Sequence, residues 1–387
     1  MRRIDRILII KGESQYGQMG AALDEMIKGF LSKGCLVTIM DLLHDDAESL
    51  RLRKDWIHDY DLIFSMNMIG LELYKADESQ LKPLFWGYLE DHPFHLHSRL
   101  EMVKGEDIIV SCCDRGHVEY IDQFYPGVKW TCFMPHGGFP GYMKSVRFED
   151  RKYDVVFIGS LTNEEALEKE LDKLRSTFGN GVDLLIERVL SDTTVELETI
   201  VKNTLFEAGS GFEKENFASI MSVFSSLDYY RRFIKRKKLL EELAMAGIRV
   251  TIFGNGWEGL SERAQKTHQL MGSIDHHLIG MIMGDSRFVL NDMPVFVDGS
   301  HDRVFAAMQC GAVCVTDRSG FLEELFTNEQ EIIFYNANHP ENVPDVLSRL
   351  MADHNKAEKI ATAGRIAAQE QTWYNLAKDI IEIAEGL

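Results

Sequence analysis

The sequence lacks the features that mark membrane, secreted and nucleic-acid-binding proteins. None of its apolar runs reaches the length of about 18 residues that spans a bilayer. The apolar core of the opening segment, MRRIDRILIIKGE, is too short for a signal peptide and is better explained as a first strand. The formal net charge of −19 leaves no surplus of positive charge, which argues against nucleic acid or an anionic membrane as the main partner.

Cysteine is present, but it lacks the spacing of a metal or redox motif. The six cysteines include no C-x-x-C pair, and most lie inside apolar runs. We therefore expect buried, reduced thiols in a cytoplasmic protein. The rest of the composition is ordinary for a globular protein, with 45% hydrophobic and 27% charged residues. A chain of 387 residues suggests two domains, each with its own core.

Apolar runs alternate with amphipathic stretches along the whole chain, which favours an α/β fold. A strand, helix, strand unit at the start indicates a parallel sheet. Residues 161–245 are predicted to be almost wholly helical, because apolar residues recur at spacings of three and four in KELDKLRSTF and TIVKNTLFEA. The segment PHGGFPGY, residues 135–142, is the best hinge candidate. The predicted strands are residues 7–10, 35–40, 61–67, 83–89, 107–113, 130–134, 154–159, 248–253, 288–290, 312–316 and 332–335.

Two glycine-rich turns follow predicted strands. GESQYGQMG has the glycine spacing of a P-loop, but Gln18 and Met19 replace the required lysine and serine or threonine. It is either an acceptor loop facing a cleft or a plain tight turn. GNGWEG, residues 254–259, matches G-x-G-x-x-G, but a dinucleotide site needs this turn to open directly into a packed helix. Polar residues follow here, so dinucleotide binding is not favoured.

Residues 287–326 carry the strongest signal for a binding site. The strand at 288–290 ends in Asn291 and Asp292, and a loop leads from it to a helix that Asp302 is predicted to cap. A second strand, a polar loop at 317–320 and another helix follow. Backbone N–H groups at two helix starts, with Arg303 beside one of them, are suited to a diphosphate.

At these residues the chain resembles a known family. The series RVFAAMQCGAVCVTD, SGFLEELF and EIIFYN is similar to the carboxyl-terminal domain of GT-B glycosyltransferases of the group 1 type, specifically the spore-maturation (CgeB-like) family. That family has a pattern close to H-x-R-x-F-E-A-M-x-x-G-x-x-x-x-x-D, followed by a helix that carries a glutamate. Many retaining relatives have two glutamates eight residues apart, where this chain has Asp298 and Ala306. The matching residues are His301, Arg303, Phe305, Ala307, Met308, Gly311, Asp317, Gly320 and Glu323.

The resemblance implies an α/β fold of two Rossmann-like domains facing across a cleft, with a helical insertion in the second. It implies an acceptor-side domain at residues 1–150, a nucleotide-sugar domain at 151–370, and a terminal helix at 371–387 that packs back on the first. Trp373, Tyr374 and Leu376 are suitable anchors for that helix. A bacterial, cytoplasmic enzyme is expected, without a metal or cofactor.

The implied reaction moves a sugar from a UDP-, GDP- or dTDP-linked donor to an unidentified acceptor. Asp91 or His92 would serve as the base if the reaction inverts, and retention needs no base. His92, His95 and His97 lack the accompanying pattern of a metal site. The basic run YYRRFIKRKKLL is either a solvated helix face or brings Arg231, Arg232 or Lys235 to the diphosphate. The predicted donor-binding residues are Gly254, Asn255, Asn291, His301, Arg303, Ser319, Gly320, Phe321 and Glu323.

Two other functions stay open at this stage. A non-catalytic subunit that binds a sugar nucleotide is suggested by Ala306, which replaces a glutamate of the family pattern. A sugar-nucleotide epimerase on the same fold is the other alternative.

Overall fold

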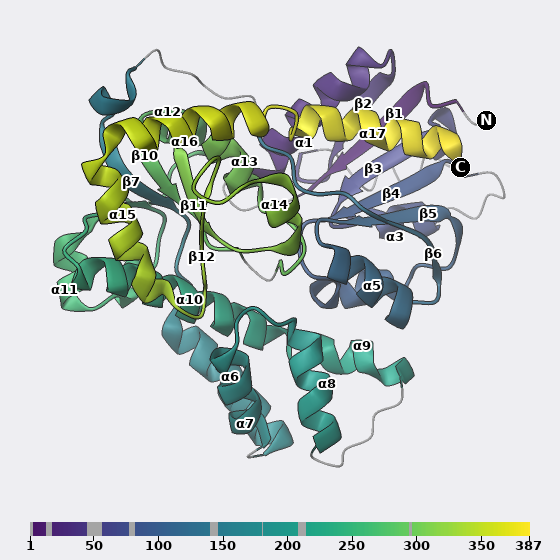
Figure 1. Ribbon diagram of the computed structural model, residues 1–387. Coiled ribbons are helices and arrows are strands. Elements are labelled where there is room, and N and C mark those ends of the chain that lie inside the picture. The colour runs from purple at the N-terminus through teal and green to yellow at the C-terminus, as the bar shows by residue number, and fades with distance from the viewer. Residues whose placement is uncertain are drawn as a thin grey trace. The chain divides into compact units, whose positions relative to one another are not determined.

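The structure, a computed structural model, describes residues 3–12, 18–44, 56–76, 82–139, 146–179, 181–207, 214–293 and 296–387. The chain splits into two compact units, each with its own six-stranded parallel sheet (Figure 1). Unit 1 comprises Met1–Phe139 and Glu370–Leu387, and unit 2 comprises Pro140–Gln369. No helix of the described residues is both long and apolar enough to cross a membrane.

The sheet of unit 1 has the strand order β2-β1-β3-β4-β5-β6. Its inner strands β3 and β4 are buried along their whole length, which explains why the sequence shows them as unbroken apolar runs. The strands are β1 Arg6–Lys11, β2 Leu36–Asp41, β3 Leu62–Met66, β4 Leu84–Leu89, β5 Gly105–Cys112 and β6 Val128–Phe133. The helices are α1 Gln18–Ser32, α3 Leu71–Ala76, α4 His97–Leu100, α5 Arg115–Phe124 and α17 Trp373–Gly386.

The last helix, α17, packs against the first, α1. The two backbones approach so closely that a Cβ atom on Gly29 would lie 2.3 Å from the carbonyl oxygen of Tyr374. Trp373 and Leu376 are buried in this contact region. The start of α17 is also bonded to the segment after β6, because Gly138 forms a bridge with Thr372. Residues 140–142 of the predicted hinge lie outside the described residues.

The sheet of unit 2 has the strand order β12-β11-β10-β7-β8-β9. Counted from the opposite edge this is the Rossmann order, in which the strand order reverses between the neighbouring parallel strands β7 and β10. Its strands are β7 Tyr153–Ile158, β8 Thr251–Phe253, β9 Gln269–Leu270, β10 Ser286–Leu290, β11 Val313–Asp317 and β12 Ile333–Tyr335. Its helices besides the insertion are α11 Glu262–Thr267, α12 His276–Gly284, α13 Asp302–Gln309, α14 Gly320–Leu325, α15 Val343–Ala352 and α16 His354–Ala367.

The predicted helical insertion lies between β7 and β8 and ends in the long helix α10. Figure 1 shows α10 beside the sheet and α6 to α9 extending away from it. The insertion consists of α6 Glu164–Phe178, α7 Gly181–Ser191, α8 Leu197–Glu207, α9 Lys214–Val223 and α10 Ser225–Met245. The helical periodicity of the sequence therefore predicted this region well.

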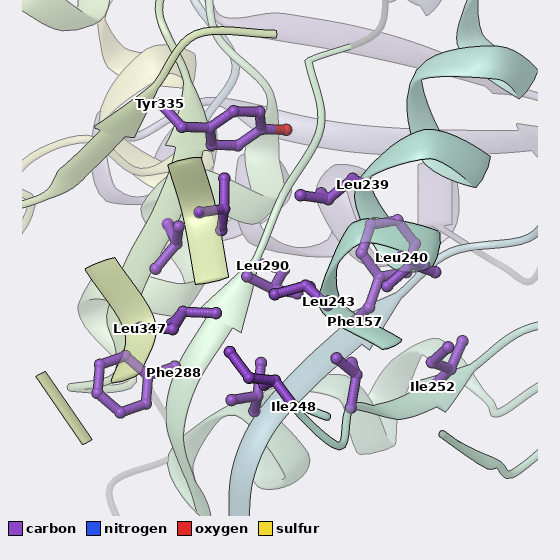
Figure 2. Packing of buried hydrophobic residues seen from close by; sticks show 14 of the residues in the cluster. Phe157, Leu239, Leu240, Leu243, Ile248, Ile252, Phe288, Leu290, Tyr335 and Leu347 are labelled. Atoms are coloured by element: carbon purple, nitrogen blue, oxygen red, sulfur yellow. The ribbon is translucent and has the colours of Figure 1, made fainter. Parts of the chain in front are cut away.

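The core of unit 2 lies where α10 and α15 pack on the sheet. Figure 2 shows Leu239, Leu240 and Leu243 of α10 close to Phe157, Leu290 and Leu347. Burying each such side chain contributes roughly 1.5–3 kcal/mol to stability. The apolar side of α10 is thus fixed against the sheet, and the position of its polar residues follows from that packing.

One local prediction needs correction. The side chain that caps α13 is His301, whose Nδ1 accepts a hydrogen bond from the Arg303 N–H at 3.2 Å, and Asp302 is the first helical residue. The backbone of His301 is extended, as that of a capping residue is, whereas Asp302 already lies in the helix. Residues Trp56–Asp59 form a short 3₁₀ helix.

Candidate functional site

Polar residues at the carboxyl ends of β10, β11 and β12 bond to one another. Asn291 Nδ2 donates to Thr316 Oγ1 at 2.9 Å, and the Tyr335 hydroxyl donates to the Asn291 carbonyl oxygen at 3.1 Å. The Met293 N–H donates to Asp317 Oδ1 at 2.6 Å. Asn291 was predicted to line a cleft, but its side chain is buried and instead supports the strand ends.

A pocket of about 190 Å³ opens beside these strand ends, within unit 2. It includes the predicted donor residues Ser319, Gly320 and Glu323, together with Lys235 of the basic run. Its other walls come from the α7–α8 loop, to which the sequence did not point, and from the carboxyl ends of β11 and β12 and the segments that follow β10, β11 and β12. These further lining residues are Thr193, Thr194, Met293, Phe296, Val297, Asp317, Arg318, Tyr335, Asn336 and Ala337.

A buried ion pair forms the floor of this region. Lys235 Nζ lies 2.7 Å from Asp317 Oδ2 and donates to the Met293 carbonyl oxygen at 2.9 Å. Burial raises the pKa of Asp317, and the hydrogen bonds from Lys235 and Met293 partly offset that rise. The Lys235 ammonium group therefore donates to two acceptors among the described residues, and its third N–H has no acceptor among them.

A second cluster of charged residues lies between β7 and β10, at the point where the strand order of the sheet reverses. Arg236 Nε donates to Asp292 Oδ2 at 2.8 Å, and Arg303 Nη2 lies 3.9 Å from Asp292 Oδ1. Arg236 and Arg303 also donate to the carbonyl oxygens of Ser160 and Ile158, at 2.7 and 2.6 Å. Although burial opposes ionisation, the two guanidinium groups hold the pKa of Asp292 below its usual value. In such folds this reversal point, at the carboxyl ends of the strands, is the usual place for ligands.

Several predicted donor residues have contacts within the protein. Asp292 lies beside the guanidinium group of Arg303. The N–H of Gly320 donates to the Val297 carbonyl oxygen at 3.0 Å. Phe321 is buried under the same turn, and Glu323 is exposed and pairs with Arg318.

The turn after β8 requires glycine at two positions because other backbone segments approach it closely. A Cβ atom on Gly254 would lie 2.1 Å from the Gly159 carbonyl oxygen, and one on Gly256 would lie 1.9 Å from that of Leu161. Both glycines also have positive φ. The exposed Asn255 bonds through its N–H to Ser160 Oγ at 3.1 Å. The turn leads into the short 3₁₀ helix Trp257–Gly259, which differs from the helix that a dinucleotide site requires.

The predicted catalytic residues lie in unit 1, after β4. His92 is 1% exposed, and its Nδ1 accepts from the Phe94 N–H at 3.2 Å as the cap of the 3₁₀ helix Pro93–Leu96. Its ring stacks on Phe94 at 3.9 Å and meets the edge of His117 at 4.3 Å. These contacts give His92 a structural role. Asp91 beside it is half-buried. Within the described ranges no three His, Cys, Asp or Glu side chains are grouped so that they could hold a metal ion.

Residues 231–382 match the family model described as glycosyl transferase-like. This part of the chain is similar to a glycosyltransferase domain. The match begins where the resemblance noted in the sequence becomes strong. It does not distinguish the spore-maturation branch from others of the group. None of the curated proteins compared with the sequence matches it.

Solved structures of low sequence identity share the fold over nearly the whole chain. Anabaena HepE in complex with UDP and glucose has a TM-score of 0.61 at 12% identity, covering 99% of this chain and all of that one. Sucrose-phosphate synthase from Thermosynechococcus elongatus has a TM-score of 0.57 at 11% identity, covering 98% of each chain. AviGT4, a glycosyltransferase involved in avilamycin A biosynthesis, has 0.54 at 12%, covering 99% and 97%. The predicted fold class, α/β with two parallel sheets as in GT-B glycosyltransferases, is confirmed.

Proposed function

We propose that the protein transfers a sugar from a UDP-, GDP- or dTDP-linked donor to an acceptor that the sequence does not identify. The observation that supports this most is the pocket in unit 2, because it adjoins three strand ends and includes residues predicted for the donor. All of its lining residues except Thr193 and Thr194 lie within the segment that matches the glycosyltransferase family model. The complexes of HepE with UDP and glucose, and with UDP-glucose, make a UDP-linked donor the first to test.

The donor diphosphate is proposed to bind to side-chain cations. Lys235 lines the pocket and has an N–H to spare, while Arg236 and Arg303 surround Asp292 at the neighbouring strand end. Charge-assisted bonds from such groups stabilise the negative charge that develops on a departing diphosphate. Catalysis in this proposal consists mainly of positioning the donor and neutralising that charge, without a metal ion.

The acceptor side is proposed to be the domain at residues 1–150, which contains most of unit 1, and the donor side is proposed to be the domain at residues 151–370. Asp91 and His92 stay predictions for a base in an inverting reaction. The bonded Nδ1 of His92 makes Asp91 the better candidate of the two. Membership in the spore-maturation (CgeB-like) branch and a cytoplasmic location belong to the same proposal.

Incubation of the protein with a panel of nucleotide sugars, without an acceptor, tests the function. Slow hydrolysis of one donor to a free sugar and a nucleoside diphosphate is the expected result. Binding without turnover would instead indicate an inactive subunit, and an altered sugar on an intact nucleotide would indicate an epimerase. A protein that binds no member of the panel would contradict the proposal.

A further inference from the structure

The helical insertion supplies part of the wall of the pocket in unit 2. Thr193 and Thr194 belong to the loop between α7 and α8, and both line the pocket. The glycosyltransferase domain match begins only at residue 231, so this loop lies outside the matched part of the chain. The insertion therefore adds to the pocket two residues that lie outside the matched segment.

Asn338, just after β12, holds this loop at the pocket. Its Oδ1 accepts from both the N–H and the Oγ1 of Thr193, each at 2.8 Å. Its Nδ2 donates to Asp192 Oδ1 at 2.9 Å. The same Asp192 oxygen accepts from the N–H and Oγ1 of Thr194, at 2.9 and 2.6 Å. Four of these five bonds involve the two threonines that line the pocket.

A buried arginine fixes the loop from the side of α10. Arg231 is 1% exposed, and its Nη1 donates to the Val195 carbonyl oxygen at 2.6 Å. Burial opposes the ionisation of Asp192, but the bonds from Thr194 and Asn338 and the nearby Arg231 hold its pKa below the usual value. Asp192 thus keeps its acceptor role at neutral pH. The loop is held from two sides, as a preorganised binding element requires.

The bonding of the threonines fixes what they offer to a ligand. Each hydroxyl donates its single hydrogen within the protein, so the oxygen presents only acceptor lone pairs. Lys235, proposed above for the diphosphate, lines the same pocket, and the Arg318–Glu323 pair adds hydrogen-bond donors and acceptors for a sugar. A sugar ring carries hydroxyls that donate and accept on adjacent carbons. The pocket volume of about 190 Å³ is below the roughly 300–1,000 Å³ of sites that enclose a drug-sized ligand, so it suits only part of a nucleotide sugar.

We propose that the α7–α8 loop recognises the glycosyl group of the donor, with Thr193 and Thr194 accepting hydrogen bonds from its hydroxyls. This inference rests on the proposed function and assigns the sugar, rather than the nucleotide, to this pocket. Asn338 and Arg231 are positioning residues, since they act through the loop.

The test compares each nucleotide sugar with its bare nucleoside diphosphate. Calorimetry would measure the affinities of UDP-glucose, UDP-galactose, GDP-mannose and dTDP-glucose, and of UDP, GDP and dTDP, for the parent and for the double variant Thr193→Val/Thr194→Val. The variant is expected to bind the preferred nucleotide sugar about tenfold more weakly, because two hydrogen bonds are lost. Its affinity for the bare diphosphate is expected to stay unchanged.

Two further variants keep the result interpretable. Thr193→Ser/Thr194→Ser retains both hydroxyls and should bind as the parent does. Thr267→Val, at the end of α11, removes a hydroxyl that bonds only within its own helix and serves as the matched control. If the valine variant does not fold, Thr194→Val alone is compared with Thr194→Ser.

The outcomes separate this inference from the proposed function. A parent that hydrolyses a donor, with valine variants that bind it as tightly as before, would contradict only the role of the loop. An equal loss for the sugar nucleotide and the bare diphosphate would also contradict it, because the loop would then act on the nucleotide or on the fold. A parent that binds no member of the panel contradicts both.

Discussion

Arg303 is held in the site by protein groups before any ligand arrives. Its Nη1 donates to the Ile158 carbonyl oxygen, and its other nitrogen lies near Asp292, which also pairs with Arg236. Although burial lowers the pKa of Arg303, the carboxylates of Asp292, Asp302 and Asp317 all favour its charged form. A diphosphate would add charge-assisted bonds to Arg236 and Arg303, which is a physical reason for placing two guanidinium groups there.

Arg303→Ala is expected to lower transfer activity by about a hundredfold, or roughly 2.7 kcal/mol, through loss of diphosphate stabilisation. Lysine should restore only part of this activity, because it lacks the planar fork. The contacts with Ile158 and Asp292 add an expected loss of stability of about 1–3 kcal/mol. Activity, nucleoside diphosphate affinity and urea unfolding would be measured on the same folded variant.

Arg151→Ala is the matched control for this change. Arg151 donates to the carbonyl oxygens of Ser286 and Gly311, so its loss should destabilise unit 2 in a similar way. Nucleoside diphosphate affinity should stay unchanged in that control. If Arg303→Ala also binds the diphosphate as the parent does, Arg303 has only a structural role.

Glu323 lines the pocket from α14 and pairs with the exposed Arg318. If it accepts hydrogen bonds from donor hydroxyls, Glu323→Gln should weaken donor affinity by about 1–3 kcal/mol. The melting temperature of the empty protein should hardly change, because exposed ion pairs contribute little to stability. Glu324→Gln, one residue along and outside the pocket lining, is the control. Equal donor affinity in the two variants would remove Glu323 from the site.

At the scale of elements, α10 connects the core of unit 2 to its charged site. Leu239, Leu240 and Leu243 pack into the core, while Lys235 and Arg236 bond to Asp317 and Asp292 at the strand ends. Both sets lie on one helix, so the packing of the leucines determines where the cations lie. A change in the core is therefore expected to affect the site as well.

Leu240→Ala is expected to lower the free energy of unfolding by about 2–5 kcal/mol, because it leaves a cavity at a fully buried position. Chemical denaturation would give this value. Leu278→Ala on α12 is the control, since Leu278 is 46% exposed and its truncation should cost far less. Similar losses for the two variants would contradict the packing described for α10.

The turn before β12 is tied to α15 and α16 by a surface ion-pair group. Glu329 lies 2.6 Å from Arg349 Nη2 and 2.7 Å from Lys356 Nζ, and these partners lower its pKa from 4.5 to about 2. A carboxyl group whose pKa is lower in the folded than in the unfolded protein stabilises the fold at pH values above its unfolded pKa. This contribution is lost as the pH falls from 4.5 towards about 2.

Glu329→Gln is therefore expected to be less stable than the parent at pH 7 by under about 1 kcal/mol, given the exposure of the pair. The difference should shrink steadily below pH 4.5. Urea midpoints of both proteins between pH 3 and 7 would show this. A difference that stays constant over that range would mean that Glu329 stabilises the turn by some means other than its charge.

At the scale of the whole molecule, sequence patterns revealed the strands because parallel strands are buried on both faces. LFWGYL of β4 and the run before Asn291 in β10 are examples. The two-residue strand β9 is too short to leave such a pattern. The amphipathic spacing of residues 161–245 was likewise sufficient to predict α6 to α10.

The site was less predictable, because it depends on contacts between distant segments. Ser319, Gly320 and Glu323 were found because they follow a strand in a recognisable pattern. Thr193 and Thr194 were missed, because tertiary hydrogen bonds bring them to the pocket. One of these bonds joins Thr193 to Asn338, which lies 145 residues later in the chain. The pairing of Arg303 with Asp292 and the bond from Gly320 to Val297 also depend on how loops fold over the strand ends.

The central claim is that unit 2 binds a nucleotide sugar at the carboxyl ends of β7 and β10 to β12. The most direct measurement is a crystal structure of the protein with the donor that the panel identifies. The diphosphate is expected within hydrogen-bond distance of Lys235, Arg236 or Arg303, and the sugar beside Thr193, Thr194 and Glu323. A donor bound without contact to any of these residues would contradict the account.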